Sequence, residues 1–537
     1  MTHEATTAER RDPDGLRWQV RRLGTGAAAI TADATPSAEL TLRLRALRDA
    51  LWEARPRSVA DLVPGYRGLL AEFRAGADAD EVARWLARPR THAEGVTPPR
   101  SERISVRYGD RADREALERI TGLPWATIVE RHAAATYTVA FIGFTPGFPY
   151  LHGLPAALAA PRRERPAALV PAGAVAIADG QAGIYPSASP GGWWVLGTTD
   201  ARLFDPRRSP PALLAAGDEV RFVAEETGAP PTIAGRAPPL GTQLASEQAV
   251  LVIDDVWAGA ATLQARPRWG VGHHGMAQAG ALDAAARDAA QEIVGAPRDS
   301  PALELIVPHL RLRCLRATRL AVTGGGVRVW LDGREQPTWR ALTCTPGSEL
   351  TLTPAAPQAA GTSYLAIAGG IAWPWDEHVQ DDLRRSASSD VRAGVGRALH
   401  AGDTLWPAGP GGAPRPWIGR PRYGGRVYLR IHPGPQATAP ALEALTGRSW
   451  RLRTRDRTAA RLEGPQLALE RHDVRSEGVP WGAVQVPGDG QPLVLLSDRG
   501  RTGGYAAPAI VDPRDLWQLA QAGPGSEVWF LRPDWRH

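Results

Sequence analysis

The chain has 537 residues and a formal net charge of +6. It contains no lysine, so all 63 of its Lys+Arg residues are arginine, and it contains no asparagine either. The absence of lysine excludes a phosphate-binding loop built on lysine, Schiff-base chemistry, and covalent attachment of biotin or lipoate to this chain. A hydrophobic content of 43% and a charged content of 22% are those of a globular protein with sizeable cores.

Arginine and acidic residues are interleaved along the chain, so we expect a solvated mixed surface and no binding of nucleic acid. The two cysteines, Cys314 and Cys344, are too few for a disulfide framework and indicate a reducing compartment. The N-terminus carries charges where a signal peptide has an apolar core, and no window approaches about 18 uninterrupted apolar residues. We therefore expect a cytoplasmic protein with no membrane span.

The chain alternates strand signals with fewer helix signals. Period-two alternation predicts strands at 104–108, 310–314, 327–331 and 427–431. Helix signals occur at 40–51 behind Ser37, between Asp283 and Gly295, and at 516–522 behind Asp512-Pro513. The pattern predicts a strand-rich α+β protein.

Two stretches rich in proline and glycine divide the chain. They predict, in chain order, an N-terminal tail (1–15), an α/β lobe (16–100), a barrel (101–224), a linker (225–247), the first lobe of the C-terminal half (248–406), a second linker (407–425) and a second barrel lobe (426–537).

The sequence also repeats itself in four ordered elements. The first two pairs are Pro171-Ala-Gly-Ala-Val-Ala-Ile with Pro480-Trp-Gly-Ala-Val-Gln-Val, and Asp179-Gly-Gln with Asp489-Gly-Gln. A Gly-Gly-aromatic triplet at 191–193 and 503–505 follows, and then a Glu-Val strand at 219–222 and 527–530. This order predicts a duplicated β-barrel-like unit, one in each half.

The densest motif is the segment 141–155, which holds three glycines, three phenylalanines and three prolines. Such a segment makes tight turns and brings backbone near a surface. Two interpretations stay open. The segment is either a loop that cradles a ligand with backbone N–H groups and aromatic walls, or a rigid corner that plugs a barrel.

Several charged residues are candidates for chemistry. The guanidinium groups of Arg162 and Arg163 suit a carboxylate or phosphate, with a solvated basic turn as the alternative. His132 is a candidate acid or base, although a lone histidine is more often structural. His273 and His274 are adjacent and lack an acidic companion at ligand spacing, so we expect no metal site.

Polar residues on glycine-rich loops form the other candidates. Gln181, Tyr185 and Ser189 lie on such a loop and are suited to orienting an amide or carboxylate; the alternative is turn capping. The glycines at 324–326 lack the spacing of a dinucleotide-binding loop, so we expect a turn or bulge there. No Ser-His-Asp order stands out, and these residues by themselves name no reaction.

The N-terminal half nevertheless carries motifs of a known family. They are Gly143-Phe-Thr-Pro-Gly-Phe-Pro-Tyr-Leu, Val170-Pro-Ala-Gly-Ala-Val-Ala-Ile, Gln181-Ala-Gly-Ile-Tyr-Pro and Ser189-Pro-Gly-Gly-Trp. With them, residues 18–223 closely resemble the B subunit of bacterial 5-oxoprolinase. The same domain occurs in a sporulation-kinase inhibitor and in urea carboxylase.

The C-terminal half carries matching motifs of a second family. They are Gly280-Ala-Leu-Asp, Tyr364-Leu-Ala-Ile-Ala-Gly-Gly-Ile, Arg461-Leu-Glu-Gly-Pro, Gln485-Val-Pro-Gly-Asp-Gly-Gln and Thr502-Gly-Gly-Tyr. Residues 250–533 resemble the C subunit of the same enzyme, so the chain looks like a natural fusion of the two. The resemblance implies duplicated cyclophilin-like β-barrels with smaller α/β lobes.

The C-terminal half departs from its family at several positions. The run from Leu263 to Arg268 lacks an aspartate and a glycine that are usual there, and Thr458 also departs. Gln291 and Ala296 stand where asparagine is usual, which fits a chain without asparagine.

The resemblance implies ATP-dependent opening of 5-oxoproline to glutamate, with Mg²⁺ accompanying the ATP. It also implies a separate partner, the A subunit of the lactam-utilisation type, and a small amide or lactam as substrate. At matched positions it implies catalytic roles for His132, Arg162 and Arg163. It implies substrate binding by Gln181, Tyr185, Ser189, Gln264, Arg268, Asp283, Gln485 and Thr502.

Two alternatives remain. One is a carboxyltransferase-like protein that acts on urea or a related amide with a separate biotin carrier, since this chain cannot carry biotin itself. The other is a non-catalytic binding protein that resembles the kinase inhibitor.

Overall fold

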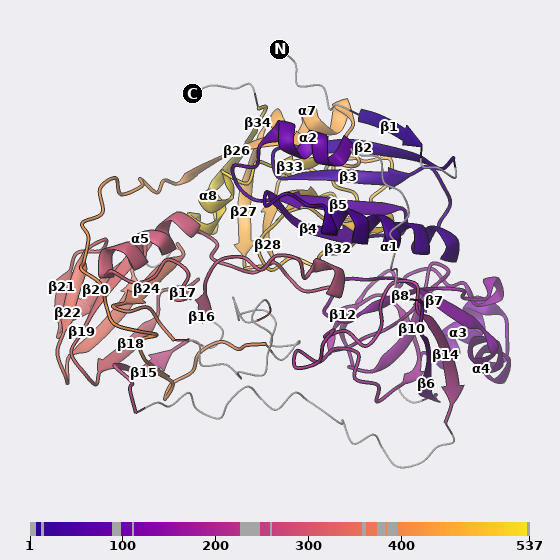
Figure 1. The fold of residues 1–537 in the computed structure, drawn as a ribbon, viewed down its shortest axis with the longest axis horizontal. Helices are drawn as coiled ribbons and strands as arrows, with labels where there is room; N and C mark the ends of the chain where they lie inside the picture. The colour runs from indigo at the N-terminus through magenta and orange to yellow at the C-terminus, as the bar shows by residue number, and fades with distance from the viewer. Residues whose placement is uncertain are drawn as a thin grey trace.

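The computed structural model describes residues 7–11, 15–87, 98–109, 112–225, 247–257, 260–356, 361–372, 383 and 395–533. Most of the predicted linker at 225–247 and much of the predicted tail at 1–15 lie outside these ranges. The predicted strand-rich α+β fold is confirmed: two closed barrels and two lobes account for the described chain (Figure 1). Over the same ranges, no helix has both the length and the apolar character needed to cross a membrane.

The N-terminal lobe is a five-stranded antiparallel sheet in the order β1-β2-β3-β5-β4, flanked by two helices. Its elements are β1 (Thr7–Arg11), β2 (Arg17–Leu23), β3 (Ala27–Ala32), α1 (Ala38–Glu53), β4 (Val59–Pro64), β5 (Gly68–Phe73) and α2 (Ala79–Ala87). Helix α1 begins as predicted, because the Leu40 N–H donates to the Ser37 hydroxyl at 3.1 Å. Its Leu40, Leu44 and Leu51 side chains are buried in the core of the lobe.

The first barrel closes in the order β10-β11-β8-β7-β14-β6-β13. Its elements are β6 (Ser101–Tyr108), α3 (Arg114–Thr121), α4 (Trp125–Ala134), β7 (Thr136–Ile142), β8 (Pro149–His152), η1 (Ala156–Leu158), β10 (Ala174–Ala178), β11 (Gln181–Ile184), β13 (Trp194–Thr198) and β14 (Glu219–Ala224). A separate two-stranded sheet joins β9 (Ala167–Val170) and β12 (Ser189–Gly191).

The second barrel closes in the order β26-β33-β30-β31-β28-β27-β34. Its elements are β26 (Arg426–Pro433), α7 (Ala439–Thr446), β27 (Ser449–Arg455), β28 (Ala459–Glu463), β30 (Ala483–Gln485), β31 (Leu493–Leu495), β33 (Ala509–Val511), α8 (Leu516–Gln521) and β34 (Glu527–Leu531). It too has a separate two-stranded sheet, of β29 (Asp473–Gly478) and β32 (Thr502–Tyr505). When the seven strands of each barrel are numbered along the chain, both barrels pair them in the same circular order. The predicted duplication is therefore confirmed.

The remaining lobe packs a six-stranded sheet, β21-β20-β23-β18-β15-β25, on a five-stranded sheet, β16-β17-β24-β19-β22. Its elements are β15 (Leu251–Val256), β16 (Ala261–Gln264), α5 (Ala284–Val294), β17 (Ala302–Leu305), β18 (Leu310–Cys314), β19 (Thr318–Gly324), β20 (Val327–Leu331), β21 (Arg334–Gln336), β22 (Ala341–Cys344), β23 (Glu349–Pro354), β24 (Ser363–Ile367) and β25 (Thr404–Leu405). The short helix η2 (Gly272–His274) lies instead against β4 of the N-terminal lobe and β7 of the first barrel. Helix α5 begins at its predicted cap, since Asp283 accepts from the Ala286 N–H at 3.0 Å. Gly324 is the last residue of β19, and Gly325 and Gly326 make the bend between β19 and β20.

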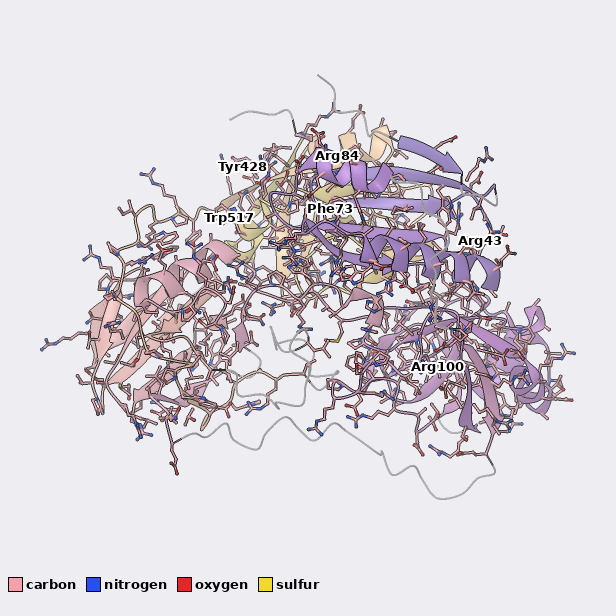
Figure 2. All side chains as sticks on the ribbon, in the orientation of Figure 1. Arg43, Phe73, Arg84, Arg100, Tyr428 and Trp517 are labelled. Atoms are coloured by element: carbon pink, nitrogen blue, oxygen red, sulfur yellow. The ribbon has the colours of Figure 1, made fainter. Side chains whose placement is uncertain are left out.

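The N-terminal lobe lies beside the second barrel, although the two are far apart in the sequence (Figure 1). Figure 2 shows Phe73 of the lobe and Tyr428 and Trp517 of the barrel in the same upper part of the molecule. The two units are joined by buried charges. Glu72 pairs with both Arg499 and Arg501.

Asp61 completes this ionic cluster. Its carboxylate lies 3.0 Å from the terminal nitrogen of Arg501 and accepts the Gly272 N–H, also at 3.0 Å. The Arg499 guanidinium also donates to the Val479 carbonyl at 3.0 Å and to the Gln278 side chain at 2.9 Å. Two carboxylates thus face two guanidinium groups, and the cluster holds three parts of the chain together.

Loss of one member of this cluster is expected to destabilise the protein strongly. Glu72→Gln leaves two buried guanidinium groups with one carboxylate, so the free energy of unfolding should fall by about 3–5 kcal/mol. Urea unfolding monitored by tryptophan fluorescence measures this. Glu335→Gln, which breaks an exposed pair with Arg328, is the control and should leave the midpoint unchanged. Equal midpoints for the two variants would contradict the prediction.

His132 lies in the core of the first barrel. Its ring stacks on Phe222 with 4.7 Å between ring centres, and its Nδ1 lies 2.7 Å from the Tyr108 hydroxyl oxygen. Burial lowers the pKa of His132 from 6.5 to about 3. The imidazole is therefore neutral and serves as a packed core residue.

This burial predicts a dependence of stability on acid. As pH falls below about 6.5 the unfolded histidine binds a proton that the folded one, with its pKa of about 3, does not, so stability is lost. Between pH about 6 and about 4.5, the free energy of unfolding of His132→Gln should fall by about 2 kcal/mol less than that of the unsubstituted chain. Urea unfolding at a series of pH values measures the slopes. The exposed His400 provides a control, His400→Gln, whose slope should match the unsubstituted chain; a parallel slope for His132→Gln would refute the prediction.

Candidate functional site

The first barrel meets the second at a buried polar surface, which we call the seam. Its six residues come from both halves of the chain: Tyr66, Phe144, Tyr150, Gln181, Ser476 and Thr502. All of them are buried except Phe144, which is partly exposed. Buried polar groups are normally hydrogen-bonded, and one of the bonds here, from the Phe144 N–H to the Thr502 hydroxyl, crosses between the two halves of the chain.

The motif at 141–155 forms one side of the seam. Phe144 has a left-handed backbone with φ +61°, and its N–H donates to the Thr502 hydroxyl at 2.8 Å. A Cβ atom on Gly143 would lie 2.2 Å from that same hydroxyl oxygen, so only glycine fits there. The segment therefore presents backbone to the second barrel.

Two tyrosines line the seam behind this segment. Interactions with the side chains of Ser476 and Thr502, both on the sheet β29–β32, partly oppose the rise in the pKa of the Tyr150 hydroxyl that burial causes. The Tyr66 hydroxyl, from the turn between β4 and β5, donates to the Gln181 side-chain oxygen at 2.7 Å. Burial raises the pKa of both tyrosines, so both hydroxyls are neutral and can donate hydrogen bonds.

Aromatic rings back these polar groups. Tyr66 meets Phe141 edge to face at 4.9 Å between ring centres and His152 at 5.0 Å. Tyr185 meets Phe148 edge to face at 5.2 Å, and a Cβ atom on Gly191 would lie 2.3 Å from its hydroxyl. Tyr185 is thus wedged beneath the β12 strand, close to the seam.

Arginines border the seam, and the structure distinguishes between the predicted pair. Arg162 donates from Nε to Asp179 at 2.8 Å, and its other two nitrogens face Gly504 of β32. Arg163 turns elsewhere: it pairs with Asp113, and its guanidinium lies 4.5 Å from the centre of the Trp194 ring. Arg162 therefore reaches the seam, and Arg163 is engaged on the outside of the barrel.

The other predicted residues fall into three places. Thr502 is itself a seam residue. Gln485 lies beside it, because the Gln485 amide nitrogen is 2.9 Å from where a Cβ atom on the next residue, Gly503, would stand. Ser189 is fully buried on β12, and its hydroxyl has no hydrogen-bond partner among the described residues. His132 lies in the barrel core, apart from the seam.

Gln264, Arg268 and Asp283 belong to the first lobe of the C-terminal half and do not reach the seam residues through any described contact. Asp283 accepts from the Gln521 amide at 2.8 Å, and its N–H donates to the Tyr364 hydroxyl at 2.7 Å. Burial raises the pKa of Asp283. Gln264 is fully buried and donates to the Thr262 hydroxyl at 3.2 Å, and Arg268 is fully buried and donates to the Ala277 carbonyl at 3.3 Å.

Sequence reasoning missed four seam or near-seam residues: Tyr66, Tyr150, His152 and Ser476. Tyr150 and His152 stand inside the motif at 141–155, which was a usable signal. Tyr66 lies in an ordinary-looking turn of a different lobe, and nothing in its sequence context marks it.

The seam combines neutral hydroxyl donors, a fixed side-chain amide and arginine at its border. Such a set suits a small ligand with a carbonyl or amide and a negative charge. Within the described ranges, no three His, Cys, Asp or Glu side chains gather in a way that would hold a metal ion.

The chain matches two family models. Residues 18–214 match the carboxyltransferase domain, subdomain C and D, and residues 274–532 match the carboxyltransferase domain, subdomain A and B. In overall structure the chain is similar to the crystal structure of TTHA0988, with 35% sequence identity and a TM-score of 0.82 over 94% of this chain and 99% of that one.

Named relatives match each half. The N-terminal half is 38% identical to the B subunit of 5-oxoprolinase from Escherichia coli O157:H7 over 208 residues, which is 38% of this chain and 95% of that protein. The C-terminal half is 32% identical to the C subunit of 5-oxoprolinase from Escherichia coli K12 over 283 residues, which is 50% of this chain and 87% of that protein. Urea amidolyase of Saccharomyces cerevisiae is more distant, at 26% identity over 48% of this chain and 15% of that protein. The chain therefore belongs to the carboxyltransferase-domain family of the 5-oxoprolinase B and C subunits, with both kinds in one polypeptide.

Proposed function

We propose that this chain is the fused B and C component of an ATP-dependent 5-oxoprolinase, which opens 5-oxo-L-proline to L-glutamate together with a separate partner protein of the lactam-utilisation type. The observation that carries the proposal is that the two halves of one chain are similar to two different subunits of that enzyme. The halves meet at a seam to which each contributes polar groups. The seam suits a small amide with a negative charge, and 5-oxoproline is a lactam that carries a carboxylate.

The lactam is a stable amide, and ATP with Mg²⁺ supplies activation of its carbonyl oxygen by phosphoryl transfer before water attacks. In this proposal the residues of the chain bind and orient the substrate. The neutral hydroxyl of Tyr150 donates a hydrogen bond to its carbonyl. The Tyr66 hydroxyl donates to the Gln181 side-chain oxygen, and that oxygen also accepts the lactam N–H. These contacts keep the planar amide in one orientation during activation.

The other candidate functions have less support. The urea amidolyase similarity covers half of this chain at low identity, and a chain without lysine cannot be biotinylated. A purely inhibitory protein does not account for relatives of two different enzyme subunits in one chain.

Turnover with the partner is the primary test. The full chain mixed with the partner protein, ATP, Mg²⁺ and 5-oxo-L-proline should release glutamate and consume ATP in equal amounts, measured by a coupled glutamate assay. Urea with a biotinylated carrier protein is the comparison substrate and should give no product. Absence of glutamate with a partner that is active alongside authentic B and C subunits would overturn the proposal.

The seam hydroxyl provides a sharper test. Tyr66→Phe keeps the ring contacts but removes the hydrogen bond to Gln181, so kcat/KM for 5-oxoproline should fall about tenfold or more. Tyr137→Phe is a matched control, because Tyr137 is also a buried tyrosine but lies in the barrel core. The control should keep the activity of the unsubstituted chain; equal losses in both variants would show that the seam hydroxyl has no special role.

A further inference from the structure

Gln436, which is not a seam residue, connects β29 to the segment that follows β32. Its amide nitrogen donates to the Glu477 carboxylate on β29 at 2.7 Å, and its amide oxygen accepts the Ala507 N–H at 2.9 Å. We call these two hydrogen bonds the Gln436 bridge. Since Ser476 precedes Glu477 and Thr502 begins β32, the bridge joins the two segments that carry the seam residues of this small sheet.

The Gln436 amide has only one orientation that suits both partners. A carboxylate accepts hydrogen bonds and a backbone N–H donates them. A rotated amide would put its oxygen against the Glu477 carboxylate and its NH₂ group against the Ala507 N–H. The bridge is therefore a polar fit that requires an amide at this position, and an apolar side chain of the same length could not make it.

The backbone that carries Gln436 is held by both units that meet there. On the side of the barrel, a Cβ atom on Gly434 would lie 2.1 Å from the Ala507 carbonyl oxygen, so only glycine allows this close approach. On the side of the N-terminal lobe, the Arg21 guanidinium of β2 donates to the Pro435 carbonyl at 2.9 Å. Gln436 therefore reaches Glu477 from a backbone whose position is set by the lobe and the barrel together.

The turn that carries Tyr66 lies directly on the backbone of β29. A Cβ atom on Gly65 would lie 3.0 Å from the Glu477 Cα and 3.4 Å from the Gly478 nitrogen. On the same strand, a Cβ atom on Gly478 would lie 2.5 Å from the Leu70 Cβ of β5. The lobe and β29 leave no room for a side chain at these two glycines, so a shift of β29 would also shift Tyr66.

Glu477 is a partly buried carboxylate that makes no ion pair with any residue that the structure describes. The Gln436 amide bonds to it, Arg21 and Arg67 act on it at longer range, and burial raises the pKa of Glu477. A neutral acceptor at this position would cost less to bury. A carboxylate instead makes the bond to the amide shorter and stronger, which suits a contact that holds a strand in place.

We propose that Gln436 is a positioning residue of the seam. It forms no hydrogen bond with any described seam residue and acts through Glu477, whose backbone lies between Ser476 and the turn of Tyr66. The bridge thereby keeps groups from the two halves of the chain in the geometry that orients the substrate. The effect on turnover rests on the proposed function, whereas the effect on the sheet β29–β32 does not.

A reciprocal exchange of the two side chains tests the bridge. In Gln436→Glu a second carboxylate faces Glu477, while the Ala507 N–H keeps an acceptor. In the double variant, Gln436→Glu with Glu477→Gln, the amide and the carboxylate have changed places and both bonds form again. Gln491→Glu is the matched control, because the Gln491 side chain also makes two hydrogen bonds, to the N–H and the carbonyl of Gly464 at 2.9 and 3.0 Å, near the surface of the same barrel.

Hydrogen exchange of the full chain, followed by mass spectrometry, reports on the sheet without turnover. Gln436→Glu should speed exchange about tenfold or more in residues 473–478, 502–507 and 65–68, and leave residues 101–108 of the first barrel unchanged. The double variant should return exchange to within about threefold of the unsubstituted chain. Gln491→Glu should match the unsubstituted chain in all four segments.

Turnover with the partner protein then separates positioning from general destabilisation. Gln436→Glu should lower kcat for 5-oxoproline about tenfold and change KM by less than about threefold, because orientation is lost rather than affinity. The double variant should regain most of the lost kcat, and Gln491→Glu should lose none.

Three results would overturn the assignment: exchange unchanged by Gln436→Glu, a double variant no better than Gln436→Glu, or faster exchange in all segments together. If Gln436→Glu does not fold, Gln436→Leu replaces it, since it removes both bonds without adding a charge; unchanged exchange in that variant would equally overturn the assignment. The exchange results stand even where no glutamate forms with the partner, so failure of the proposed function is seen separately.

Discussion

The arrangement of the two halves depends on one buried ionic interaction, in which Glu72 of the N-terminal lobe lies between Arg499 and Arg501 of the second barrel. Charges that are removed from water must be paired, so this contact allows few alternative positions of the lobe on the barrel. Thr502 follows Arg501 directly, and its hydroxyl receives the Phe144 N–H. The pairing that fixes the lobe therefore also fixes the strand that completes the seam.

The duplicated barrels contribute to the seam in different ways. The first barrel offers the turn-rich segment at 141–155, with glycine where the backbone approaches Thr502 most closely. The second barrel offers the small sheet β29–β32, whose counterpart in the first barrel, β9–β12, carries Ser189 and covers Tyr185. One fold thus supplies two different surfaces, and the polar groups that face each other are not related by the repeat.

Much of the fold was predictable because its signals are local or repeated in order. The cap residues Ser37 and Asp283 and the four repeated elements indicate helices and a duplicated barrel from the sequence alone. The seam was predictable only in part. Gln181 and Thr502 stand in recognisable motifs, whereas Tyr66 reaches the seam through long-range packing between units, which leaves no periodic or spacing signal. His132 shows the opposite case, because it stands in a matched motif and yet lies in the core of the first barrel, away from the seam.

Because both sides of the seam belong to one polypeptide, their meeting is intramolecular. A covalent connection between two units gives them an effective concentration on the order of millimolar. Two separate proteins need an interface strong enough to survive dilution, which favours large apolar contact areas. The fused chain is released from that requirement, so the surface between its barrels can remain rich in hydroxyl, amide and guanidinium groups and still stay assembled at any cellular protein level.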